Sequence, residues 1–170
     1  SDVPTEQIAY FRANAAAATP AQGSFRATTD YDALYDMDAV IICVPTPLSR
    51  TKDPDMSYIV TAADEIARRL HHGMLIVLES TTYPGTTKEV MQRLLEAGGL
   101  KAGLDFFIAY SPEREDPGNL DFSTARIPKV VGADDPASLA IADALYGTFV
   151  PKTVPVSSAA TAEAVKITEN

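Results

Sequence analysis

The sequence lacks the features that mark several specialised classes of protein. Cys43 is the single cysteine among 170 residues, so no internal disulfide can form. No apolar run approaches the ~20 residues that a membrane-spanning helix needs, and no charged segment followed by an apolar one opens the chain. From these features we expect a cytoplasmic protein without a membrane partner.

Basic residues are also scarce. The chain has 14 Lys and Arg against 23 Asp and Glu, a net charge of −9, and its longest basic run is Arg68-Arg69. A nucleic-acid partner needs clustered cations to neutralise its phosphates, so we expect none. An anionic ligand remains compatible with this charge, because backbone N–H groups hold anions locally.

Side-chain clusters for metal or nucleophilic chemistry are missing as well. His71 and His72 follow a predicted helix with no other ligand nearby, which argues against a metal site. No Ser-His-Asp arrangement is recognisable. Cys43 lies inside an apolar run, where a free cysteine behaves as a small buried hydrophobe, so we do not expect it to be a nucleophile.

What the sequence has is a regular alternation of apolar runs and amphipathic segments. Short apolar runs typical of strands covered on both faces are AVIICV at 39–44, MLIVLE at 74–79, FFIAY at 106–110, KVVGA at 129–133 and TVPV at 153–156. Helical periodicity predicts helices at 59–70, 87–97 and 136–146, and the start of another at 162–170. The alternation predicts an α/β fold with a doubly wound, mostly parallel sheet.

Two of these helices have local start signals. Asp134 or Asp135 suits the N-cap of the third helix. One of Thr86 and Thr87 suits the N-cap of the second. We expect both helices to begin with a cap supplied by their own segment.

Loops that follow the strands are the candidate sites, because ligands of doubly wound sheets bind beyond the carboxyl ends of the strands. PTPLSR follows the first run, STTYPGTT the second and SPEREDPGN the third. Each loop is rich in Pro, Gly, hydroxyl or charged residues, and all should leave the same edge of the sheet. The sequence therefore predicts one binding site built from these loops.

The first two loops present hydroxyl groups. Val44-Pro45 holds the backbone extended, so that Thr46 can offer its hydroxyl and N–H to a phosphate or ribose. Ser80 and Thr81 follow the second strand, where a hydroxyl can position a water or a substrate group. The alternative for both loops is turn and cap chemistry, with each hydroxyl bonded to nearby backbone.

Two further pairs of polar side chains are candidates, one after the third strand and one on the last helix. Glu113 is a candidate base or acceptor of ligand hydroxyls, and Arg114 can bind a phosphate or carboxylate through two hydrogen bonds. Lys166 and Asn170 share a helix face and can stabilise an oxyanion together. The alternatives are a surface ion pair for the first two residues and an exposed polar face for the others.

Taken together, the segments IICVPTPL, LESTTYPGTT, YSPEREDPGN and AEAVKITEN resemble the UDP-glucose/GDP-mannose dehydrogenase family in order and spacing. The resemblance covers residues 25–170 and is nearest to the UDP-N-acetylhexosamine 6-dehydrogenases of bacterial surface-polysaccharide synthesis. It implies NAD as cofactor and a UDP-sugar as substrate, with UDP-N-acetylglucosamine expected, whose C6 alcohol is oxidised to a carboxylate in two steps. It also implies a homo-oligomeric parent enzyme.

The resemblance implies roles at matching positions. Cofactor contacts are implied for Asp2, Val44, Pro45, Thr46, Ser80 and Thr81. Catalytic roles are implied for Thr81, Glu113, Lys166 and Asn170, and substrate contacts for Glu113, Arg114, Lys166 and Asn170. Within this scheme Thr81 would help to hold a catalytic water, and Glu113 would be the base or a member of the proton network.

The sequence also departs from the family. It contains no G-x-G-x-x-G turn, and the family's catalytic cysteine segment and UDP-binding domain are not among its residues. We therefore expect an internal fragment that lacks the first Rossmann strand and the glycine-rich turn. Residues 1–157 would be a partial Rossmann-type NAD-binding domain and 158–170 the start of the central dimerisation helix. We expect the isolated chain to be inactive.

Two other hypotheses stay open. One is a non-catalytic module that binds a nucleotide or a partner, derived from such an enzyme, with a bared strand edge as its binding surface. The other is a flavodoxin-like signalling domain, which fits the alternation of strands and helices but leaves the composition of the three loops unexplained.

Overall fold

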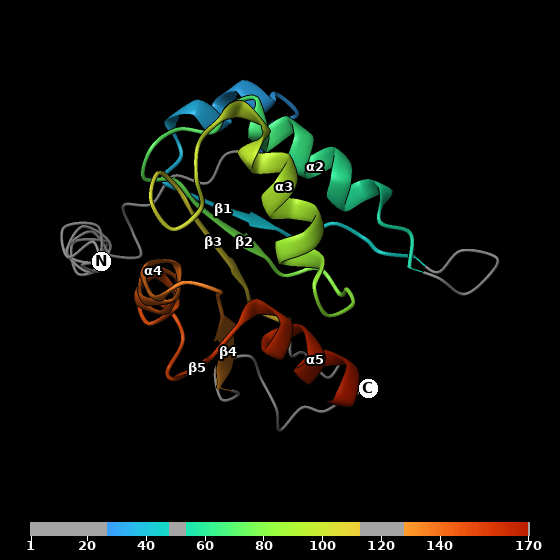
Figure 1. The fold of residues 1–170 in the computed structure, drawn as a ribbon, viewed down its shortest axis with the longest axis vertical. Coiled ribbons are helices and arrows are strands. Elements are labelled where there is room, and N and C mark those ends of the chain that lie inside the picture. Colours follow the sequence, from blue (N-terminus) through green and yellow to red (C-terminus); the bar gives the residue numbers. More distant parts are fainter. Residues whose placement is uncertain (1–26, 48–53, 113–127, 170) are drawn as a thin grey trace.

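The computed structural model describes residues 27–47, 54–112 and 128–169. These residues form a five-stranded sheet with helices on both faces (Figure 1). The strands are β1 (Ala39–Ile42), β2 (Leu75–Leu78), β3 (Phe107–Tyr110), β4 (Lys129–Gly132) and β5 (Thr153–Val156). Every apolar run singled out in the sequence forms a strand, and the predicted α/β class is confirmed.

Helical segments connect the strands. They are η1 (Tyr31–Asp36), α2 (Ser57–Ala67), η2 (Thr86–Gln92), α3 (Arg93–Leu95), η3 (Glu96–Gly98), α4 (Pro136–Tyr146) and α5 (Ala159–Glu169). The elements η2, α3 and η3 follow one another directly, as π-helical, α-helical and 3₁₀-helical parts of one stretch. Within the described ranges, no helix is both long enough and apolar enough to cross a membrane.

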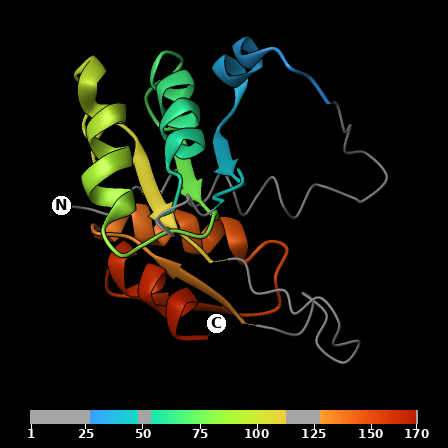
Figure 2. The same cartoon turned by 90° about the vertical axis from the view of Figure 1, so that its right-hand side faces the viewer.

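The sheet follows the chain order, β1-β2-β3-β4-β5. The first three strands are parallel, and Ile42, Leu78 and Tyr110 lie side by side at their ends. Figure 2 shows the corresponding blue, green and yellow arrows pointing the same way. The strand β4 is antiparallel to β3 and parallel to β5. The chain therefore leaves β1, β2 and β3 at one edge, as the sequence predicts.

Two hydrophobic clusters cover the two faces of the sheet. In β2, Ile76 and Leu78 pack toward α2, α3 and α5, whereas Leu75 and Val77 pack toward α4. All four side chains are fully buried. Figure 1 shows α4 on the opposite side of the strands from α2 and α3. Cover on both faces explains why the strand sequences are apolar throughout instead of alternating.

The edge strand β1 has less cover. Ile41 is 41% exposed, and Cys43, directly after the strand, is exposed. The prediction that Cys43 is a buried hydrophobe is therefore wrong. The reason is that α4 packs mainly against β2, β3, β4 and β5. The described residues therefore provide little cover for β1 on the face of the sheet where α4 lies.

The start of α4 follows the local signal in the sequence. Asp135 is its N-cap, and the Asp135 Oδ1 atom accepts a hydrogen bond from the backbone N–H of Ser138 at 2.8 Å. Pro136 occupies the first turn, where its missing N–H costs nothing. The bounds of α4 are those predicted.

The helix α5 packs closely against β4 at Gly132. A Cβ atom at this position would lie 2.4 Å from the carbonyl oxygen of Ser158 and 2.7 Å from the Cβ atom of Ala162. Both distances are shorter than any ordinary contact between such atoms, so only glycine permits the approach. Gly132 thereby sets the depth at which the first turns of α5 sit on the sheet.

Replacement of Gly132 by alanine is expected to lower the free energy of unfolding by about 1–3 kcal/mol, because the backbone of α5 must move away. Urea unfolding followed by circular dichroism measures the change. Gly98→Ala is the matched control, since a Cβ atom there has nothing within 4 Å. The control should be neutral or stabilising by about 0.5–1 kcal/mol. Equal losses in both variants would contradict the close approach.

Candidate functional site

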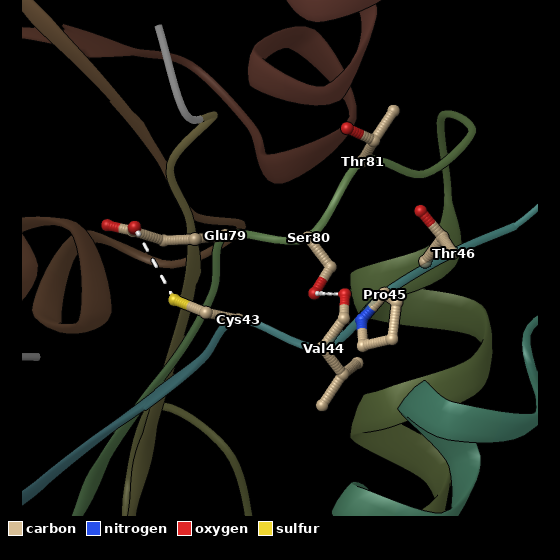
Figure 3. Close-up of a pocket in the computed structure, with 7 residues that line it drawn as sticks. All are labelled: Cys43, Val44, Pro45, Thr46, Glu79, Ser80 and Thr81. Atoms are coloured by element: carbon tan, nitrogen blue, oxygen red, sulfur yellow. Dashed lines mark hydrogen bonds between the residues drawn. The ribbon is translucent and has the colours of Figure 1, made fainter. Parts of the chain in front are cut away.

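A pocket of ≈ 320 Å³ lies where β1 and β2 end (Figure 3). It is lined by Cys43, Val44, Pro45, Thr46, Glu79, Ser80 and Thr81. The structure thus brings together all the site residues predicted from the first two loops. Cys43 and Glu79 also line the pocket, although the sequence did not single them out as site residues.

Ser80 joins the two loops. Its Oγ atom donates a hydrogen bond to the Val44 carbonyl at 2.7 Å, and its backbone N–H donates to the Ile42 carbonyl at 3.3 Å. The Tyr110 hydroxyl donates to the Ser80 carbonyl at 3.4 Å. Ser80 is buried, so these bonds fix the direction in which the chain leaves β2. Its hydroxyl proton is engaged within the protein, as the turn-chemistry alternative predicts.

The hydroxyls of Thr46 and Thr81 are differently placed. Thr46 is partly buried and Thr81 is exposed, and neither side chain bonds to another described residue. In the view of Figure 3, both hydroxyls lie above the hydrogen bond between Ser80 and Val44. Two hydroxyls that can both donate and accept therefore border one pocket, 35 residues apart in the sequence.

Glu79, which lines the other end of the pocket, belongs to a largely buried ion pair. Oε1 of Glu79 lies 2.9 Å from Nζ of Lys129, and each side chain is only 11% exposed. The Tyr146 hydroxyl donates to the same oxygen, and Nζ of Lys129 lies 5.3 Å from the centroid of the Tyr146 ring. The Cys43 thiol donates to Oε2 of Glu79 at 3.8 Å. This cluster ties the ends of β1, β2 and α4 to the start of β4.

The electrostatics of the cluster keep the Tyr146 phenol neutral. Burial raises the pKa of Tyr146 well above its ordinary value, and the negative charge of Glu79 raises it further. The phenol therefore stays protonated and remains a donor. Because Glu79 already accepts from Tyr146 and pairs with Lys129, we interpret the cluster as an anchor for the pocket wall.

The helix after β2 begins differently from the prediction. Its N-cap is Gly85, in the left-handed region with φ +101°, and no side chain of the same segment caps it. The prediction of Thr86 or Thr87 as N-cap is therefore wrong. The backbone N–H groups of Gly85 and Thr87 donate instead to the carboxylate of Glu163, on α5. Glu163 is not among the predicted site residues, because the sole sequence signal for it is a carboxylate among the alanines of α5.

The remaining predicted site residues are not part of the pocket as described. Lys166 is partly buried on α5 and does not line it. Asp2, Glu113, Arg114 and Asn170 lie outside the described residues. The part of the chain that the structure covers has no group of three or more His, Cys, Asp or Glu suited to a metal ion.

Comparison with known proteins gives consistent matches. The model of the UDP-glucose/GDP-mannose dehydrogenase family, NAD binding domain, matches residues 12–150. The UDP-N-acetyl-D-mannosamine dehydrogenase of Pyrococcus horikoshii is 36% identical over 148 residues, which cover 87% of this chain and 35% of that protein. The UDP-N-acetyl-D-glucosamine 6-dehydrogenase of Pseudomonas aeruginosa is 37% identical over 139 residues, which cover 81% of this chain and 33% of that protein.

A solved structure agrees with the sequence comparison. The NDP-N-acetyl-D-galactosaminuronic acid dehydrogenase from Methanosarcina mazei Go1 superposes with a TM-score of 0.79 at 38% identity, covering 86% of this chain and 32% of that one. The chain thus spans about a third of the length of the curated relatives it matches. Since the family model covers well over half of its residues, the chain belongs to the UDP-glucose/GDP-mannose dehydrogenase family and carries that family's NAD-binding domain.

Proposed function

We propose that this chain supplies part of the NAD site of a UDP-N-acetylhexosamine 6-dehydrogenase, which oxidises the sugar C6 alcohol to a carboxylate for surface-polysaccharide synthesis. The observation that carries the proposal is the pocket bordered by the hydroxyls of Thr46 and Thr81. It lies at the carboxyl edge of the sheet, where doubly wound folds bind their ligands. The N-acetylhexosamines in the relatives' names support the sugar class, with UDP-N-acetylglucosamine as the expected substrate.

The pocket suits a part of NAD. Its ≈ 320 Å³ is near the lower end of the ~300–1,000 Å³ common for small-molecule sites, so a nucleoside-sized portion fits and the whole dinucleotide does not. Thr46 and Thr81 would hold hydroxyl or amide groups of that portion. The chemistry that NAD supplies when bound is the acceptance of a hydride from the substrate carbon.

The other roles are proposed from the resemblance. Glu113 would act as base or in the proton network, and Arg114 would contact the sugar nucleotide. Lys166 and Asn170 would hold substrate and stabilise an oxyanion, and Asp2 would bind the adenosine ribose. We further propose residues 1–157 as the partial NAD-binding domain, 158–170 as the start of the dimerisation helix, and a homo-oligomeric cytoplasmic parent enzyme.

A second candidate is a non-catalytic module that binds a partner along β1. The exposure of Ile41, on that edge strand, favours it. Gel filtration over a range of concentrations tests the second candidate at low cost. A monomer throughout would count against a partner-binding edge at β1.

The isolated chain is expected to bind NAD weakly, with a Kd of roughly 1 mM, because it has no glycine-rich turn for the pyrophosphate. Thr46→Val and Thr81→Val should each weaken binding by roughly two- to tenfold, the cost of losing one neutral hydrogen bond. NMR titration with NAD measures these affinities and shows whether the amides at 44–46 and 79–81 shift.

Thr153→Val is the matched control for this titration. Thr153 lies in β5, at the opposite edge of the sheet from β1. The substitution makes the same hydroxyl-to-methyl change as the two test variants. The affinity of the Thr153→Val variant for NAD should equal that of the unmodified chain. The proposed site would be excluded if all three variants bound alike, or if the shifts mapped to other elements.

We also expect that the chain alone produces no NADH from UDP-N-acetylglucosamine or UDP-N-acetylmannosamine. In the family the second oxidation uses a covalent cysteine intermediate, and the Cys43 thiol instead donates a hydrogen bond to the Glu79 carboxylate. Absorbance at the NADH band, with each sugar nucleotide in turn, measures turnover. NADH formation above a blank without enzyme would refute the expectation.

A further inference from the structure

Glu163 is a fully buried carboxylate on α5 that bonds only across the fold. Its Oε1 atom accepts hydrogen bonds from the backbone N–H of Thr87 at 2.8 Å and from Thr87 Oγ1 at 2.7 Å. Its Oε2 atom accepts from the backbone N–H of Gly85 at 2.5 Å. These donors lie 76 and 78 residues away in the sequence, at the first turn of η2.

A charge is costly at such a position. An ion moved from water into a protein interior loses several kcal/mol of solvation, which must be recovered in hydrogen bonds. The first turn of η2 recovers it, because its N–H groups have no helical partner and the helix dipole is positive there. A hydroxyl cap from Thr86 or Thr87, which begin η2, could accept hydrogen bonds from these N–H groups without burying a charge from another element. The distant carboxylate adds a link that a local cap cannot supply.

The Glu163 hydrogen bonds join a loop and a helix to which the proposed function assigns ligand contacts. On one side, the loop from Ser80 to Gly85 carries Thr81, at the pocket. On the other, Lys166 follows Glu163 by three residues, within one turn of α5. The loop has an anchor on each side of Thr81: Ser80 bonds to Val44, and Gly85 bonds to Glu163.

We propose that Glu163 is a positioning residue that holds the loop from Ser80 to Gly85 at a fixed place relative to Lys166. This loop, which carries Thr81, and the helix α5 then move as one body. The loop and the helix otherwise belong to different connections of the sheet. The part of this inference that concerns ligands rests on the proposed function, whereas the mechanical link stands on the hydrogen bonds alone. Glu163 acts through Thr81 and Lys166 and touches no ligand itself.

Glu163→Gln tests the link without changing the size of the side chain. The glutamine has one acceptor oxygen, and its NH₂ group faces N–H donors, so at least one bond is lost together with the charge. Amide hydrogen exchange should accelerate by about tenfold to a hundredfold, the cost of losing a hydrogen bond to a charged group. The acceleration should appear in both 80–87 and 159–168, with amides of α4 unchanged.

Glu89→Gln is the matched control. Glu89 is an exposed carboxylate in the first turn of the same helix, so this variant removes a charge of the same sign without cutting the link to α5. It should leave exchange in α5 unchanged. Acceleration confined to 85–87, or equal acceleration in α4, would overturn the proposal, because the carboxylate would then be a local cap or a general contributor to stability.

The second readout is affinity for NAD, measured by NMR at a temperature at which circular dichroism shows both variants folded. Glu163→Gln should weaken NAD binding by about threefold to tenfold through the displaced Thr81, and Glu89→Gln should not. An unchanged affinity in Glu163→Gln would overturn the positioning role. If the unmodified chain does not bind NAD, the proposed function fails, and the exchange measurement alone decides whether Glu163 links the two segments.

Discussion

The parallel pairing of β1, β2 and β3 is the constraint on which the candidate site depends. Because Ile42, Leu78 and Tyr110 are neighbours in register, the chain leaves all three strands at one edge. Adjacent exits allow the side chain of Ser80 to bond the backbone after β1. That bond in turn closes one side of the pocket, so that residues from two loops face the same small volume. The chemistry of the site therefore follows from strand order.

Two carboxylates stiffen this edge from opposite faces of the sheet. Glu79 pairs with Lys129 and ties the pocket wall to β4 and α4, and Glu163 ties the following helix to α5. Tyr110 is fully buried. Burial raises the pKa of its phenol well above the ordinary value, and the negative charges of Glu163 and Glu79 raise that pKa further. Each charge is satisfied by groups from other elements, so each one joins parts of the chain that the backbone leaves separate.

Local features of the fold could be read from the sequence, and long-range ones could not. The run that forms β2 is apolar because both faces are covered, and Asp135 caps a helix three residues away, so both signals lie within one segment. The exposure of Cys43 depends on what packs beside β1, which its own segment does not encode. The cap at Thr87 comes from Glu163, 76 residues later, where no local pattern points to it. The antiparallel direction of β4 is likewise set by its neighbours, since its apolar run resembles those of the parallel strands.

The most direct test of the proposed NAD site is a crystal structure of the chain soaked with NAD. We expect cofactor density in the pocket at the ends of β1 and β2, with the hydroxyls of Thr46 and Thr81 within about 3.2 Å of cofactor oxygen or nitrogen atoms. Ordered cofactor elsewhere on the molecule, with this pocket holding only water, would contradict it.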